Sequence, residues 1–154
     1  MRLKSTKPSL GENSHPRFPD WESRLHDFAN EVMEKPFVLG ETNCSMLAAR
    51  AVDVMYETDF FNEFRLVAPS DESELSEALS RRTLREFEAH GFSKVEKNFE
   101  QTGDVLIGWK EPFERCAVYL GGGRCLTSSR EHGVRLVPLN VFVRAYEPEV
   151  FRWV

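Results

Sequence analysis

The sequence predicts a single domain of the α+β class, with helices first and an antiparallel sheet after them. Residues 20–55 carry apolar side chains at helical spacing, and residues 104–138 carry short apolar runs typical of strands. A Gly-Gly-Gly turn at 121–123 joins two of these runs and indicates a hairpin. Helical and strand patterns do not alternate, which argues against a βαβ fold, and 154 residues suffice for one core.

The first 19 residues contain three prolines and no periodic pattern, and they predict an extended arm that either docks on a neighbour or stays unstructured. The domain proper is expected over residues 20–154. A first helix should begin behind Asp20 as N-cap and end near Lys35, since one face carries Trp21, Leu25, Phe28 and Val32.

A second helix is expected to begin at Thr42 or Asn43, and it is apolar around most of its circumference. Such a helix is central and buried, and the aromatic residues 60–65 should pack on it. Capping residues at 70–74 and a glycine at 91 predict a third long helix.

The last third of the chain has the pattern of a meander. Strands are expected at 104–109, 116–120, 124–127 and 133–138, followed by a turn or short helix at 139–146. The aromatic segment 146–154 should close the domain's own core, or else insert into a partner.

Composition limits the function classes. The formal charge is −5, from 20 basic and 25 acidic residues, which gives no general attraction to nucleic acid. No apolar run reaches the ~20 residues of a membrane span, and the N-terminal residues lack the apolar segment of a secretory signal. Three cysteines and four scattered histidines without a Cys-x-x-Cys pair predict buried thiols, no metal site and no cofactor.

Cys44 is the residue with the clearest chemical potential. At the start of a helix, unpaired backbone N–H groups and the helix dipole stabilise a thiolate and can hold an oxyanion. The alternative to a nucleophile is a structural role, in which Cys44 is a small apolar side chain that begins a buried helix. Without further motifs, the sequence around Cys44 favours this structural role.

The segment from Phe37 to Cys44, followed by a buried helix, resembles the nucleophile region of NlpC-type cysteine peptidases. It resembles more closely a group of phage tail proteins that share their papain-like fold. Those proteins show an aromatic-Trp-Gly-x-x-Asp-Cys pattern, where this chain has Leu39 and Asn43 in place of Trp and Asp. Further similar stretches are Gly103-Asp104-Val105, Val118-Tyr119-Leu120-Gly121 with Gly123, and Gly133-Val134-Arg135. The resemblance covers residues 21–154 and implies a papain-like domain with helices packed on a C-terminal sheet.

The resemblance also places the catalytic partners. The usual catalytic histidine falls on Arg115 and the third, orienting position on Thr127. A guanidinium stabilises a thiolate but transfers no proton near neutral pH, so peptide hydrolysis is not expected. His132 lies in a polar loop that either folds back toward Cys44 as a substitute base or is an exposed turn.

Three functions follow from these observations. The resemblance favours a structural component of a phage tail, at the tip or hub of the virion, with other tail proteins as partners. The alternative is an active cysteine peptidase or peptidoglycan hydrolase that uses Cys44, with His132 or a histidine of a neighbouring chain as base. A third possibility is a module that binds peptidoglycan without cutting it.

Overall fold

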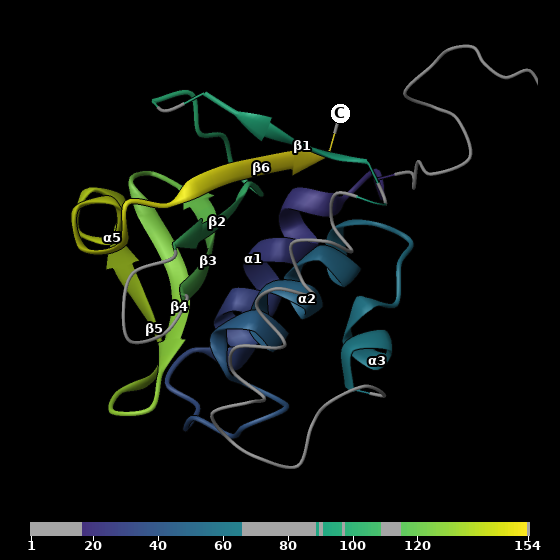
Figure 1. Ribbon diagram of the computed structural model, residues 1–154. Coiled ribbons are helices and arrows are strands. Elements are labelled where there is room, and N and C mark those ends of the chain that lie inside the picture. Colours follow the sequence, from purple (N-terminus) through teal and green to yellow (C-terminus); the bar gives the residue numbers. More distant parts are fainter. Residues whose placement is uncertain (1–16, 66–88, 90, 97, 109–114, 154) are drawn as a thin grey trace, which may run out of the picture.

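The computed structural model describes residues 17–65, 89, 91–96, 98–108 and 115–153 (Figure 1). Its helices are α1 (Trp21–Val32), α2 (Cys44–Met55), α3 (Phe60–Arg65) and α5 (Leu139–Tyr146). Its strands are β1 (Phe92–Val95), β2 (Val105–Gly108), β3 (Arg115–Gly121), β4 (Arg124–Ser129), β5 (Gly133–Pro138) and β6 (Glu149–Trp153). The α+β class with helices before an antiparallel sheet is therefore confirmed.

The six strands form one antiparallel sheet in the order β1-β6-β2-β3-β4-β5. The hairpin of β3 and β4 turns at the three glycines, all of which have positive φ. Strand β6 lies between β1 and β2, so the aromatic C-terminal segment is an interior strand of the sheet. This position confirms that the segment closes the domain's own core, although the sequence did not predict its strand pairing or strand β1.

Helix α1 is amphipathic and packs on α2. Its buried side chains are Leu25, Phe28, Ala29 and Val32, the face expected from the spacing. The side chain of Asp20 makes no capping hydrogen bond, so the predicted cap contributes only its position at the helix start.

Helix α2 occupies the centre of the larger core, with nine of its twelve residues buried. It lies between α1 and one face of the sheet, where it contacts β3 and β4, and α3 packs on it in turn (Figure 1). The central, buried helix predicted from the uniform apolar pattern is therefore confirmed, as is the packing of residues 60–65 against it.

The opposite face of the sheet is covered by α5. A smaller core forms there from Leu106, Ala117, Cys125, Phe142 and Val150. Because side chains alternate along a strand, β3 sends Cys116 toward α2 and Ala117 toward α5.

The Gly103-Asp104-Val105 stretch has a clear structural role. The buried carboxylate of Asp104 accepts two hydrogen bonds of 2.8 Å from the guanidinium of Arg152 on β6, and a third of 2.8 Å from the backbone N–H of Gln101. This bidentate ion pair fixes β6 beside the start of β2.

The N-terminal arm reaches the domain at its last residues. The guanidinium of Arg17 donates to the hydroxyl of Tyr56 at 2.9 and 3.2 Å and lies over the ring of Trp21, and the N–H of Phe18 donates to Met55. Residues 1–16 of the predicted arm lie outside the described residues, as does the helix predicted over 70–90 except for residue 89. None of the described helices is long and apolar enough to cross a bilayer.

Candidate functional site

Cys44 is the first residue of α2 and is buried, with 7% of its surface exposed. The loop before it is shaped by the side chain of Thr42, which donates to the carbonyl of Pro36 at 2.8 Å and accepts the N–H of Val38 at 2.7 Å. Asn43 accepts the N–H of Gly40 at 2.8 Å and makes no side-chain cap on α2. Asn43 therefore stabilises the loop turn, and the N–H groups of the first turn of α2 are not capped by it.

The environment of Cys44 favours the thiolate. Its pKa is lowered from 9.0 to about 6, chiefly because the side chain of Cys116 hydrogen-bonds its sulfur. Burial opposes this shift, while the backbone N–H of Cys116 and the guanidinium of Arg115 add to it. A thiol with this pKa is mostly ionised at neutral pH, which makes it a nucleophile.

Arg115 begins β3 and lies beside Cys44, half-buried. Its guanidinium hydrogen-bonds Cys44 and Tyr146. Although burial alone would lower the pKa of Arg115, the negative charge of Cys44 and the contacts with Tyr146 raise it. The position that the resemblance assigned to the catalytic histidine thus lies in contact with the thiol and carries a permanent cation.

Tyr146 is a site residue that the sequence did not reveal. It ends α5 and lies against Gly108, where an added Cβ would come within 2.5 Å of the Cβ of Tyr146. Gly108 pairs with Arg115 between β2 and β3, so the missing side chain lets Tyr146 approach the guanidinium. A glycine at the end of a strand was the only signal in the sequence for this close approach.

Thr127 is buried on β4. Its hydroxyl donates to the backbone carbonyl of Cys116 at 2.7 Å. This contact joins β4 to β3 at Cys116, and it holds the strand segment that carries Arg115 and Cys116.

His132 lies in the turn between β4 and β5 with its side chain exposed. Its backbone N–H donates to the hydroxyl of Ser129 at 3.2 Å, and its imidazole hydrogen-bonds none of the described residues. The turn is fixed because Val134 exchanges two backbone hydrogen bonds of 2.9 Å with Glu34 and Lys35. The groups that lower the pKa of Cys44 are Cys116 first and Arg115 after it, and no histidine is among them.

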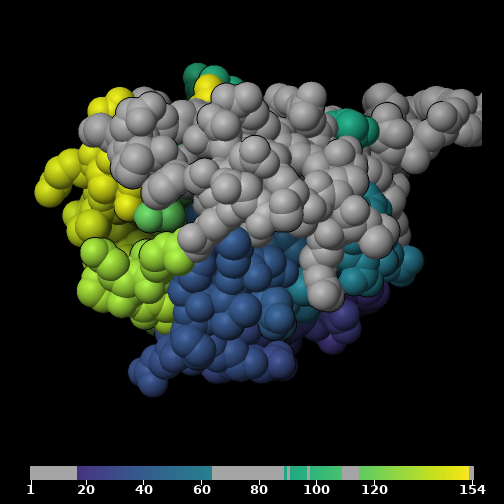
Figure 2. Space-filling view, turned by 60° about the horizontal axis from the view of Figure 1, so that its bottom comes forward, coloured from purple at the N-terminus to yellow at the C-terminus, as the bar shows by residue number. Residues whose placement is uncertain are grey.

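Figure 2 shows the face of the molecule on which these segments meet. The residues around the start of α2 (blue) lie beside the β4–β5 segment (lime). Arg130 of that segment lies over the ring of Phe37, 5.0 Å from its centroid. In the part of the chain that the structure describes, no three His, Cys, Asp or Glu side chains gather to hold a metal ion.

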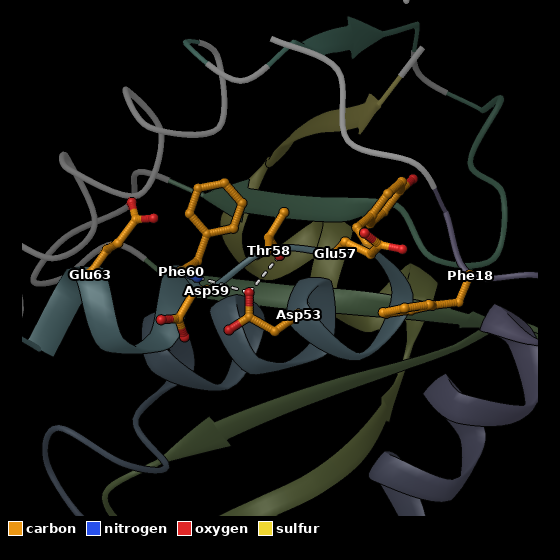
Figure 3. A pocket seen from close by; sticks show the side chains of 8 residues that line it. Phe18, Asp53, Glu57, Thr58, Asp59, Phe60 and Glu63 are labelled. Atoms are coloured by element: carbon orange, nitrogen blue, oxygen red, sulfur yellow. Dashed lines mark hydrogen bonds between the residues drawn. The ribbon is translucent and has the colours of Figure 1, made fainter. Parts of the chain in front are cut away.

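A separate hollow of about 580 Å³ lies at the far end of α2 (Figure 3). Among its lining residues, Asp53 is directed at the start of α3, where it accepts hydrogen bonds from the N–H groups of Phe60 (2.8 Å) and Phe61 (3.0 Å) and from Thr58 (2.6 Å). Burial raises the pKa of Asp53 against these bonds. The carboxylate therefore serves the turn between α2 and α3.

Two solved structures with a similar fold are both described as NlpC/P60 proteins. A NlpC/P60 family protein from Bacillus cereus superposes with a TM-score of 0.53 at 19% identity, over 83% of this chain and 39% of that one. The NlpC/p60 domain of the peptidoglycan hydrolase SagA superposes with a TM-score of 0.52 at 16% identity, over 86% of this chain and 98% of that one. This chain thus spans well under half of the first protein. The NlpC-like, papain-like fold is confirmed by these similarities.

Sequence comparison gives the family. No curated protein matches the sequence. A family model described as "Domain of unknown function (DUF6950)" matches residues 16–147, from the end of the arm through α5. Because the match covers most of the sequence, the chain belongs to the DUF6950 family.

Proposed function

We propose that this chain is a peptidase-fold domain that holds a thiolate but does not cut peptide bonds. The observation that carries the proposal is the contact of Arg115 with the sulfur of Cys44. An ion pair of this kind stabilises the anion, so the nucleophile is retained, while no histidine is among the described groups that act on it.

The missing proton transfer affects both halves of hydrolysis. After a thiolate attacks an amide, the leaving amine must be protonated, and water must later lose a proton to open the acyl-enzyme. The guanidinium of Arg115 does neither near neutral pH, because its pKa lies far above 7 and is raised further by Cys44. Without these proton transfers, the rate of each step should be lower by about 10²–10⁴-fold.

The setting that we propose is the tail of a phage virion, at the tip or hub, with other tail proteins as neighbours. The support is the resemblance of the Phe37–Cys44 segment and of the later strands to phage tail proteins of this fold. In that setting the domain would act through its surface, since a fold does not by itself fix an activity. The proposed position in a phage tail is tested by searching purified virions for the chain and by determining the structure of the particle. If purified virions do not contain the chain, the proposal is contradicted.

The inactivity is tested by assay on peptidoglycan fragments and on thiol-directed acyl substrates. We expect the protein to release no product in steady state, and at most one equivalent of leaving group from acylation of Cys44. An Arg115→His variant tests whether the imidazole is the missing part, with Cys44→Ser as its control. Steady turnover by the unaltered protein, abolished by Cys44→Ser, would overturn the proposal.

An active cysteine hydrolase is the second candidate function. It is favoured by the lowered pKa of Cys44, about 6, and by the likeness to a domain of a peptidoglycan hydrolase. His132, or a histidine of a neighbouring chain, would have to reach the sulfur. A His132→Gln variant that abolishes turnover would support this candidate, whereas equal activity would exclude His132 as the base.

A further inference from the structure

The thiol of Cys116 lies against Cys44 in the core between α2 and β3. It hydrogen-bonds the sulfur of Cys44, and its own sulfur lies 3.8 Å from the hydroxyl of Ser45. Because Cys44 and Ser45 are the first two residues of α2, both sulfur atoms lie at the same end of this helix. Both residues are thiols in the structure. Both lie in one core cluster, on two elements that pack against each other, which is the placement that a disulfide between them requires.

The two thiols differ in access. Cys44 keeps 7% of its surface exposed, whereas Cys116 is fully buried. Cys44, the less deeply buried of the two, is also the thiol whose pKa is lowered, to about 6. A thiolate nearer the surface, next to a second and fully buried thiol, is the arrangement of an attacking and a resolving cysteine.

The surroundings of Cys116 contain an unsatisfied polar group. The hydroxyl of Ser128 is buried and has no hydrogen-bond partner in the described chain. Ser128 pairs with Val134, whose side chain belongs to the core beneath α2, so Ser128 faces the same side of the sheet as Cys116. The continued register of β3 and β4 makes Ser128 and Cys116 cross-strand neighbours. A buried donor beside the thiols is able to hydrogen-bond a small oxygen-containing group.

We propose that Cys44 and Cys116 form a redox pair, in which a hydroperoxide oxidises Cys44 and Cys116 then closes an intramolecular disulfide. The inference rests on the pairing of Cys44 with Arg115 that carries the proposed function. It assigns to the retained thiolate a chemistry that needs no histidine.

Both steps balance. The sulfur of Cys44 attacks one oxygen of the hydroperoxide, the O–O bond breaks, and the product is a sulfenic acid and an alkoxide or hydroxide that takes up a proton from water. The sulfur of Cys116 then attacks the sulfur of Cys44, the S–O bond breaks, and the departing hydroxide takes the proton of Cys116 to form water. The two thiols lose two electrons, which reduce the peroxide.

The test is oxidation of the purified protein with limiting hydrogen peroxide, followed by alkylation and peptide mapping without reductant. We expect a linked Cys44–Cys116 peptide, with Cys125 recovered as a thiol. Cys116→Ala should stop at a sulfenic acid on Cys44, which dimedone captures. Cys125→Ala is the matched control, because Cys125 is buried on the other face of the sheet, and it should form the same linked peptide.

Absence of the linked peptide at peroxide concentrations that oxidise Cys44 would overturn the redox pair, as would oxidation of Cys125 at the same rate. If Cys116→Ala does not fold, Cys116→Ser provides the same test. Hydrolysis assayed on the same preparation separates the two proposals. If the protein turns over a peptide substrate and also forms the linked peptide, the proposed inactivity is refuted and the redox pair stands. If it shows neither turnover nor the linked peptide, only the redox pair is refuted.

Discussion

Replacement of Arg115 by glutamine should shift the titration of Cys44 toward higher pH. The guanidinium of Arg115 stabilises the thiolate by its charge and by a hydrogen bond. Glutamine has no charge and can replace only part of the hydrogen bonding. An opposite charge at contact distance typically moves a pKa by about 1–3 units. We therefore expect the pKa of Cys44 to rise from about 6 by about 1–2 units.

The consequence for reactivity depends on pH. At pH 6 about half of the thiol is ionised in the unaltered protein, and a rise of about 1–2 units reduces this fraction by roughly five- to fifty-fold. At pH 10 both proteins should be ionised and react at similar rates, because the intrinsic nucleophilicity of a thiolate changes only slowly with its pKa.

The assay is the rate of alkylation of Cys44 by iodoacetamide between about pH 4.5 and 10, followed by peptide mass spectrometry. Cys125 serves as an internal control, since burial raises its pKa to about 12 and should keep it unreactive. Arg135→Gln, an exposed cation on β5, is the matched control and should leave the midpoint unchanged. A midpoint that stays within roughly 0.3 units in Arg115→Gln would refute the assigned ion pair.

The remaining predictions concern stability. Arg152→Ala leaves the buried carboxylate of Asp104 without its ion pair and should lower the free energy of unfolding in urea by about 3 kcal/mol. Lys94→Ala removes an exposed ion pair and should lower it by less than about 1 kcal/mol, so equal losses would contradict the assigned difference. Ser128→Ala removes a buried hydroxyl without a described partner and should raise the free energy of unfolding by about 1 kcal/mol, so a loss would show that the hydroxyl is satisfied. The thiolate of Cys44 should stabilise the fold fully above its unfolded pKa near 9.0, and this contribution, at most about 4 kcal/mol, is lost as pH falls through about 6; Cys44→Ser should abolish this pH dependence.

Helices α1 and α2 and the β2–β5 meander could be predicted because their signals are local. The spacing of Leu25, Phe28 and Val32 specifies one face of a helix, and the three glycines at 121–123 specify a hairpin without reference to the rest of the chain. Strands β1 and β6 could not be predicted in the same way. Their pairing joins Phe92 to Trp153 across more than a third of the sequence, and β1 has only one fully buried side chain.

The candidate site was predictable only in part. The resemblance led to Cys44 and Arg115, which are in contact. It gave no reason to single out Cys116, which the composition explained as a buried thiol, because its position depends on how α2 crosses β3. Asn43 shows a second limit, since it occupies the N-cap position of α2 while its side chain accepts the N–H of Gly40 and does not cap the helix. A residue type that suits two neighbouring turns cannot be assigned between them from sequence.

The placement of β6 has a consequence for how the protein is made. Residues 149–153 form β6, which pairs with β1 on one side and with β2 on the other. The strand that joins β1 to β2 is therefore absent until this segment has left the ribosome. A nascent chain stopped before residue 149 would expose the edge of β2 to other chains, a route to aggregation. Assembly of the sheet therefore has to wait for nearly the whole domain, and slow folding with late protection of β1 in hydrogen exchange is the expected kinetic signature.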